Sequence, residues 1–193
     1  MLARVIDERP SFDLNAWMQR LPALDLFGAL VFQVTGQQTS VAAATAIFGR
    51  LIERFGGRAP DPKGVAALDP ETLRELGLSS QKANTVLDLA RRFRFRDTRL
   101  SEADLRNLPD EEAIGQLTAV KGVGLWMAKG ALLIALRRPD LICTDDVALR
   151  HAIQVQYGMD RLPDPDEVVA LAQRWRPYRS LASSLLLATG RSK

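Results

Sequence analysis

The sequence feature that most constrains this chain is a pair of glycines, Gly122-Val123-Gly124, set between two apolar segments. The segment before the pair places Ile114, Leu117 and Val120 at helical spacing, and a second apolar segment, 126–136, follows almost at once. Glycine tolerates positive φ and leaves its backbone uncovered, so the pair predicts a tight turn between two helices. The amide groups at the start of the second helix lack acceptors within that helix, and an anion can dock there.

A helical pattern extends along most of the chain. Apolar residues recur at intervals of three and four between residues 41 and 55, and Gly56-Gly57 predicts the end of that helix. Ser79 or Ser80 can cap a helix that begins near Gln81. No stretch shows the pattern of a β-hairpin. The sequence therefore predicts an all-α fold.

The composition restricts the class of protein. Hydrophobic residues make up 47% of the 193 residues and charged residues 25%, which is ordinary for a globular protein. The formal net charge of +3 is mild. A single cysteine excludes an internal disulfide and a four-cysteine zinc or iron–sulfur site. With only one histidine, a metal site would have to consist of oxygen ligands.

We expect no targeting segment in the first residues, because charges at positions 4, 7, 8 and 9 interrupt them. The longest apolar run, residues 131–136, is too short to span a bilayer. We therefore expect a soluble, cytoplasmic protein with no membrane partner, associated with the nucleoid if its source is bacterial.

Four blocks follow one another in a fixed order: residues 36–40, residues 76–83, the glycine hairpin, and residues 144–150. Together they resemble the helix-hairpin-helix DNA glycosylase superfamily, in particular its alkylation-repair branch, the 3-methyladenine DNA glycosylase II type. The resemblance covers about residues 20–190, and its strongest part is the hairpin followed at this spacing by the block with Asp146.

The resemblance implies an all-α, two-lobed helical bundle with a cleft between the lobes. One lobe would comprise about residues 35–130, including the hairpin at 114–136. The other would combine residues 1–34 with residues 131–193. Larger members of the family carry an N-terminal β domain, and we expect none in this chain.

The activity implied is that of a monofunctional DNA glycosylase in base excision repair. Such an enzyme flips an alkylated base, such as 3-methyladenine or 7-methylguanine, out of duplex DNA and hydrolyses its N-glycosidic bond. Relatives that also cut the strand place a lysine at the position of Trp126, so we expect no lyase activity here. We expect the protein to act on DNA as a monomer.

Asp146 matches the catalytic aspartate of the family. A fixed carboxylate there stabilises the positive charge that develops on the deoxyribose as the base departs. The residues themselves leave an alternative, because Thr144, Asp145 and Asp146 are all good caps for the helix that follows. Given the hairpin upstream, we assign Asp146 to catalysis and expect Asp145 or Thr144 to be the cap.

Trp126 matches a tryptophan that lines the base pocket in the alkylation-repair relatives, where it stacks on a cationic methylated base. Its alternative role is core packing. Three other aromatic positions of the better-known relatives correspond here to Val147, Gly130 and, less surely aligned, Leu187. We therefore expect a wider, shallower base pocket that also admits 1-methyladenine and 3-methylcytosine.

Gln38, together with Gln37, falls where the family carries the side chain that fills the gap left by the flipped base. The alternative is a polar helix start without a function. The hairpin residues Val120, Lys121, Gly122, Val123 and Gly124 would bind one DNA phosphate through their backbone, and Lys82 would add a second phosphate contact. The resemblance adds a Na⁺ or K⁺ ion held by the carbonyls of Thr118, Val120 and Val123, and no other cofactor.

Two other functions remain open at this point. The same fold acts on other lesions, such as uracil, mismatched thymine or oxidised guanine. The missing lysine and iron–sulfur cysteines disfavour the oxidised-base and strand-cutting branches. A helix-hairpin-helix module can also bind DNA or a repair partner without catalysis.

Overall fold

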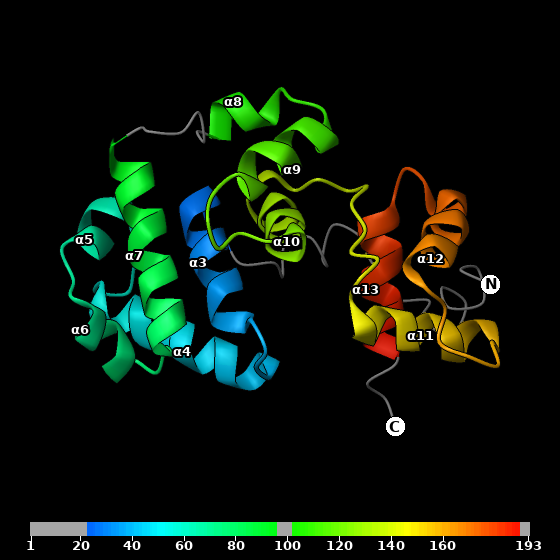
Figure 1. The fold of residues 1–193 in the computed structure, drawn as a ribbon, viewed down its shortest axis with the longest axis horizontal. Coiled ribbons are helices and arrows are strands. Elements are labelled where there is room, and N and C mark those ends of the chain that lie inside the picture. The colour runs from blue at the N-terminus through cyan, green and yellow to red at the C-terminus, as the bar shows by residue number, and fades with distance from the viewer. Residues whose placement is uncertain (1–22, 96–101, 190–193) are drawn as a thin grey trace. The chain divides into compact units, whose positions relative to one another are not determined.

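The computed structural model describes residues 23–95 and 102–189 (Figure 1). Every regular element in these ranges is a helix, which confirms the predicted all-α fold. The elements are α3 (Leu26–Gly36), α4 (Val41–Arg54), α5 (Pro62–Ala66), α6 (Pro70–Glu75), α7 (Ser80–Phe95), α8 (Glu102–Arg106), α9 (Asp110–Thr118), α10 (Leu125–Leu136), α11 (Val147–Tyr157), α12 (Pro165–Ala172), the 3-10 helix η1 (Gln173–Trp175) and α13 (Arg179–Thr189).

Several predicted helix ends are confirmed. Helix α4 ends at Arg54, and the next two glycines, Gly56 and Gly57, take positive φ angles of 66° and 82°. Ser79, and not Ser80, caps α7, because its Oγ accepts a hydrogen bond from the amide of Lys82 at 3.3 Å. These boundaries follow from local chemistry, so a single sequence was sufficient to predict them.

The described chain divides into two compact units, residues 23–136 and residues 137–189, called here the first and second unit. This division differs from the lobes expected from the sequence, which assigned residues up to 34 to the C-terminal lobe. Helix α3 belongs to the first unit because it packs against α10, α4 and α7. Its side chains are buried nearly all round the helix, so α3 needs neighbours on every side.

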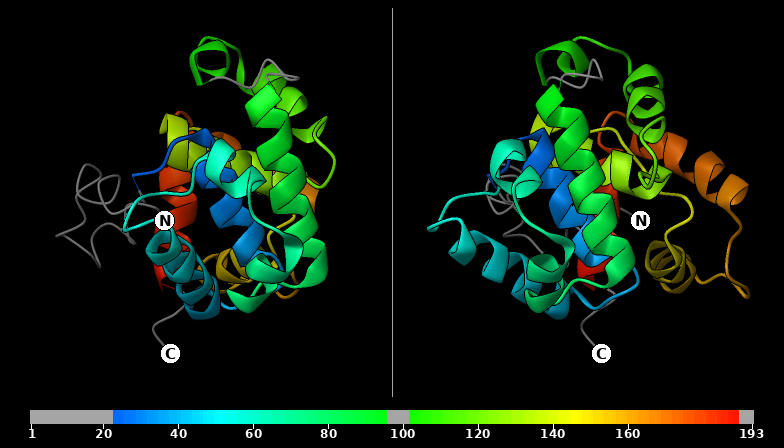
Figure 2. Two further views of the ribbon diagram at one scale, coloured as in Figure 1. Left: turned by 90° about the vertical axis from the view of Figure 1, so that its left-hand side faces the viewer. Right: turned by 60° about the vertical axis from the view of Figure 1, so that its left-hand side comes forward.

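Helix α3 lies at the centre of the first unit (Figures 1 and 2). Asp25 caps its start by accepting a hydrogen bond from the amide of Gly28 at 2.7 Å. Phe27 of α3 packs against Phe93 of α7 with 5.4 Å between ring centroids, and Phe32 packs edge-on against Phe48 of α4 at 5.1 Å. The position of α3 in this core fixes where its C-terminal end lies.

The second unit is built around α11, α12 and α13. Its core includes Leu149 and Ile153 of α11, Val168 of α12 and Leu186 of α13. The guanidinium of Arg179 donates hydrogen bonds to both carboxylate oxygens of Asp140, at 2.8 and 3.0 Å. Burial alone would raise the pKa of Asp140, but the hydrogen bonds and charge of Arg179 outweigh burial and hold that pKa below its usual value. The ion pair between Arg179 and Asp140 therefore holds the start of α13 against the segment before α11.

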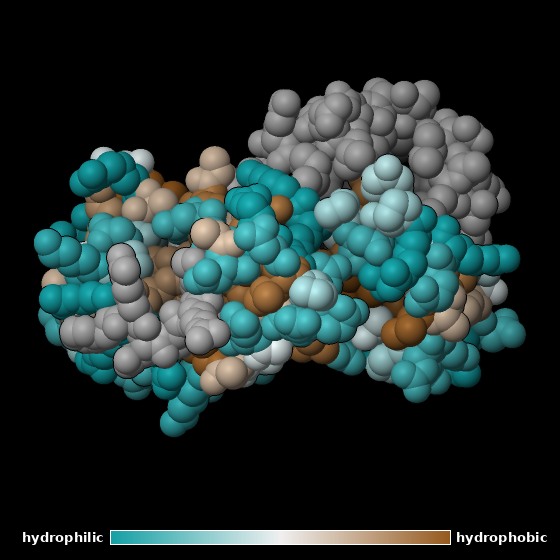
Figure 3. Space-filling model, turned by 90° about the horizontal axis from the view of Figure 1, so that it is seen from above, coloured by the Kyte–Doolittle hydropathy of each residue, from teal (hydrophilic) through white to brown (hydrophobic). Residues whose placement is uncertain are grey.

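The surface of the described residues is mainly hydrophilic on the face drawn in Figure 3, with smaller hydrophobic areas between. Within the described ranges, the large hydrophobic side chains that are exposed are Leu125, Trp126, Val147, Val155, Val169 and Tyr178. None of the helices within 23–95 and 102–189 combines the length and apolar character needed to cross a membrane. Two of the exposed residues, Trp126 and Val147, are among the predicted site residues.

Candidate functional site

The predicted hairpin is formed by α9, a turn at residues 119–124, and α10. Val120 and Val123 are buried, and the amide of Val123 donates to the carbonyl of Val120 at 3.0 Å. Gly122 has a φ of +90°, whereas Gly124 does not take positive φ. A Cβ atom at Gly124 would meet nothing within 4 Å. The two glycines therefore differ: Gly122 makes the turn, and Gly124 leaves the backbone uncovered at the start of α10.

The turn exposes amide groups. Gly122 and Gly124 are exposed, and within the described part of the chain their N–H groups donate to no backbone carbonyl. The helical hydrogen bonds of α10 begin with the amide of Ala128, which donates to the carbonyl of Gly124 at 3.0 Å. The amides of residues 125–127 precede it and have no acceptor within the helix. This end of α10 therefore has the geometry and the positive dipole end that bind an anion.

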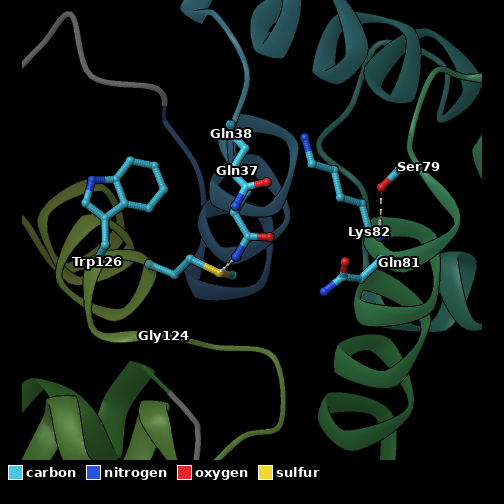
Figure 4. A pocket seen from close by; sticks show the side chains of 9 residues that line it. Gln37, Gln38, Ser79, Gln81, Lys82, Gly124 and Trp126 are labelled. Carbon is cyan, nitrogen blue, oxygen red and sulfur yellow. Dashed lines mark hydrogen bonds between the residues drawn. The ribbon is translucent and has the colours of Figure 1, made fainter. Parts of the chain in front are cut away.

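A pocket of about 460 Å³ opens beside this turn, within the first unit. Three segments that are distant in the sequence line it (Figure 4). They are the end of α3 with the connector after it (Gly36, Gln37, Gln38), the start of α7 (Ser79, Gln81, Lys82), and the end of the hairpin with α10 (Gly124, Trp126, Met127). The pocket thus brings together five predicted site residues: Gln37, Gln38, Lys82, Gly124 and Trp126.

The two glutamines after α3 are held differently. Gln37 is half-buried, and its Nε2 donates to the sulfur of Met127 at 2.7 Å. Gln38 is exposed, has a positive φ of 48°, and makes no side-chain hydrogen bond to another described residue. Neither residue is in a helix, because α4 begins at Val41 and its cap is Ser40. Gln37 therefore anchors the connector, and Gln38 projects from it.

Lys82 is tied to the end of α3. Its Nζ donates to the carbonyl of Thr35 at 3.0 Å, and burial lowers the pKa of its ammonium group. Thr35 is in the last turn of α3, where a positive charge is favoured by the helix dipole. An ammonium group has three donors, so this bond leaves donors for a phosphate.

Trp126 stands at the edge of the pocket with 39% of its surface exposed, so it is not a core residue. The Cη2 atom of its ring would lie 3.7 Å from a Cβ atom at Gly36. The indole therefore lies against the backbone of α3 at Gly36, and part of its surface is exposed at the edge of the pocket. A planar group can stack on such a ring.

Gly130 was expected to leave a gap in the base pocket, and the structure contradicts this. A Cβ atom at Gly130 would lie 2.5 Å from Nε2 and 2.6 Å from Cδ of Gln33, whose side chain occupies the space. The sequence analysis did not single out Gln33. Its signal was a polar residue in the otherwise apolar core of α3, at a position where the pattern calls for an apolar one.

In the second unit, Asp146 is itself the cap of α11. One carboxylate oxygen, Oδ1, accepts hydrogen bonds from the amides of Ala148 at 2.9 Å and Leu149 at 3.1 Å. The prediction that Asp145 or Thr144 is the cap was therefore wrong. Asp146 precedes the first residue of α11 and has extended backbone angles, as a cap requires.

The two remaining predicted pocket residues are also in the second unit. Val147 is 54% exposed, and Leu187 is half-buried against the core of that unit. Among the described residues, no group of three or more His, Cys, Asp or Glu side chains could hold a metal ion. The carbonyl of Val120 already accepts the amide of Val123, and a cation held by the carbonyls of Thr118, Val120 and Val123 stays a prediction.

The fold and the turn define the class of this protein as a helix-hairpin-helix protein. A family model described as "HhH-GPD superfamily base excision DNA repair protein" matches residues 31–177 of the 193. The chain belongs to this superfamily.

Several similar proteins are DNA-3-methyladenine glycosylases by name. A DNA-3-methyladenine glycosylase of Bacillus subtilis is 29% identical over 172 residues, which cover 84% of this chain and 56% of that protein. A solved structure of a DNA-3-methyladenine glycosidase from Bacillus halodurans has a TM-score of 0.75 at 28% identity, covering 90% of this chain and 79% of that one.

A third similarity shows the fold alone. The structure of the Schizosaccharomyces pombe 3-methyladenine DNA glycosylase in complex with abasic DNA has a TM-score of 0.87 at 24% identity. It covers 98% of this chain and 90% of that one. The chain spans a little over half the length of the first curated relatives it matches, at 58% and 56%.

The positive φ of Gly122 predicts that replacing this glycine lowers the free energy of unfolding. Gly122→Ala should destabilise the protein by about 1–3 kcal/mol, because alanine is strained at this φ and its Cβ atom would lie 2.9 Å from Cγ2 of Thr85 on α7. Gly124→Ala is the matched control, and its effect should stay within about 0.5 kcal/mol. Urea unfolding of the three proteins measures the difference. Equal unfolding midpoints would show that Gly122 does not constrain the turn.

Proposed function

We propose that this protein is a monofunctional DNA glycosylase that releases alkylated bases, 3-methyladenine and 7-methylguanine, from duplex DNA. The observation that carries the proposal is the pocket of the first unit. It joins exposed hairpin amides, a projecting glutamine and a partly exposed indole on one surface. The family and the names of the relatives support the same activity. The protein would act as a monomer, without a membrane partner.

Binding begins at the DNA backbone. The amides of Gly122 and Gly124 and the start of α10 bind one phosphate, and a Na⁺ or K⁺ ion on the carbonyls of the turn would add positive charge next to it. Lys82 contributes a further phosphate contact. These contacts position the duplex and do not depend on sequence.

The connector after α3 supplies the side chain that supports base flipping. Gln38 enters the vacated stack, fills the gap and offers its carboxamide to the base left without a partner. The anchored neighbour, Gln37, keeps the connector in place through its bond to Met127. The flipped base stacks on Trp126, whose electron-rich face attracts a cationic methylated ring.

Asp146 stabilises the transition state of bond cleavage. The positive charge that develops on the sugar interacts with a carboxylate at ~4 Å by roughly 4 kcal/mol at an effective dielectric of ~20. A gain of this size, made only in the transition state, corresponds to about a thousandfold in rate. The amides of Ala148 and Leu149 fix one oxygen of this carboxylate, so its orientation is set before substrate binds.

The lesion supplies the remaining driving force. Methylation at a ring nitrogen makes the base a cationic leaving group, so no strong general acid is required. Trp126 has no amine that could form a Schiff base, which supports hydrolysis without strand cleavage. Release of 1-methyladenine and 3-methylcytosine is proposed because Val147 and Leu187 are smaller than the aromatic residues of the better-known relatives. Gly130 no longer supports this proposal, because Gln33 fills the space beside it.

The central test of the proposed function is Asp146→Asn. Asparagine also caps helices, so the variant should keep its fold while base release falls by two or more orders of magnitude. Its affinity for DNA should not change. Chromatography of the bases released from methylated DNA measures the loss.

The matched control is Asp145→Asn, which removes the exposed neighbouring carboxylate. It should release bases at the wild-type rate. If Asp146→Asn keeps full activity, the protein is not a glycosylase of this mechanism. If the wild type releases no base but binds DNA, a non-catalytic binding module is the better account.

The role of Gln38 has its own test. Gln38→Ala should slow base release from duplex DNA by about tenfold or more, because flipping costs a few kcal/mol that the wedge offsets. Release from single-stranded DNA, where no stack has to be filled, should change little. Thr39→Ala, an exposed neighbour, serves as the control. Equal losses on duplex and single-stranded substrates would contradict the wedge.

A further inference from the structure

Gln33 is an anomaly in the core of the first unit. It is 7% exposed, one of three buried polar side chains in the described residues, together with Thr35 and Ser180. Thr35 donates its hydroxyl to the carbonyl of Phe32 at 2.7 Å, and Ser180 is hydrogen-bonded to the backbone on both sides of Asp140. Gln33 is the one of the three whose side chain makes no hydrogen bond to the described residues. Its carboxamide is not among the fully buried polar atoms that lack a partner, so it keeps some access and is available to a partner from outside the described residues.

The neighbouring helix, α10, leaves the space in which the carboxamide of Gln33 lies. Any side chain at Gly130 of α10 would displace it, because even a Cβ atom would lie 2.5 Å from its Nε2, 2.6 Å from its Cδ and 2.9 Å from its Oε1. Gly130 is helical and does not take positive φ. The glycine is therefore not required by the backbone, and it creates the space in which the carboxamide of Gln33 lies.

This space lies one helical turn from two residues that line the pocket, Gly36 and Trp126. Gln33 is three residues before Gly36 on α3, and Gly130 is four residues after Trp126 on α10. Residues four apart share a helix face and are separated by about 6 Å along the axis. The carboxamide thus lies about one turn from the partly exposed indole of Trp126, along the contact between α3 and α10. A base stacked on Trp126 would bring its edge within reach of Gln33.

We propose that Gln33 determines specificity for the proposed reaction by hydrogen-bonding the N6/N7 edge of a flipped adenine-type base. Its Oε1 accepts from the N6 amino group and its Nε2 donates to N7, the pairing that glutamine makes with adenine in DNA recognition. The inference rests on the proposed function, since it requires a flipped alkylated base.

This pairing separates the two main lesions. In 3-methyladenine both N6 and N7 are available. In 7-methylguanine N7 is methylated and position 6 is a carbonyl oxygen, so the paired donor and acceptor that glutamine needs are absent. A buried carboxamide left unpaired by the wrong base costs roughly tenfold to a hundredfold in the transition state. Gln33 therefore favours 3-methyladenine.

The test compares single-turnover release of 3-methyladenine and 7-methylguanine from the same methylated duplex. The two bases leave at different rates for chemical reasons. The measured quantity is therefore the rate of 3-methyladenine release divided by the rate of 7-methylguanine release, compared between each variant and wild type. Gln33→Met keeps the length of the side chain without its hydrogen bonds. It should lower the ratio about tenfold or more, mainly by slowing release of 3-methyladenine.

Gly130→Ala provides an independent variant that leaves Gln33 in the sequence. The added Cβ atom would displace the carboxamide, so the ratio should fall in the same direction. Gln173→Met replaces an exposed glutamine of η1 and should leave the ratio unchanged. Thermal unfolding shows which variants are folded, and if Gln33→Met is not, Gly130→Ala decides the question.

The outcomes separate this inference from the proposed function. If wild type releases both bases and the folded variants keep the wild-type ratio, Gln33 does not read the base and only this inference falls. If wild type releases no alkylated base, the proposed function fails, and the inference fails with it. A fall in the ratio in either Gln33→Met or Gly130→Ala, with Gln173→Met unchanged, supports it.

Discussion

The packing of α3 against α10 determines where the polar side chains of the first unit lie. Each helix contributes a glycine that faces a large side chain of the other: Gly36 supports the indole of Trp126, and Gly130 makes room for Gln33. The C-terminal end of α3 leads into the connector with Gln38, and the N-terminal end of α10 is the hairpin turn. One helix pair therefore positions the proposed phosphate anchor, wedge, stacking platform and base-reading carboxamide together.

The proposed division of roles follows from this arrangement. At the pocket, the first unit would hold and select the DNA with neutral groups, namely backbone amides, carboxamides and an indole, together with the ammonium of Lys82, which donates to the end of α3. The second unit supplies the carboxylate, which is fixed by the amides of α11. A catalytic group that also caps a helix is oriented before substrate binds, and replacing it by asparagine removes the charge while keeping the cap.

The sequence predicted features that depend on neighbouring residues. The hairpin follows from two glycines between apolar helices, and the end of α4 follows from Gly56 and Gly57. The choice among Thr144, Asp145 and Asp146 as cap was wrong, because three capping residues in a row leave the first residue of the helix to tertiary packing. Gln33 was missed because its contact with Gly130 joins positions far apart in the chain, and nothing local reveals which glycine faces which side chain. The division of the described residues into two units differs from the expected lobes for the same reason, since an apolar pattern all round α3 does not identify the helices that cover it.

The claim on which the account depends is that the hairpin backbone and the pocket beside it receive DNA. Amide ¹H–¹⁵N chemical shifts, recorded while a duplex with an abasic-site analogue is titrated into the protein, test it most directly. The account predicts that the amides of Gly122 and Gly124 and the indole N–H of Trp126 show the largest changes, and that they saturate together. If these signals stay in place while the duplex binds and others shift, the DNA is held elsewhere and the account is contradicted.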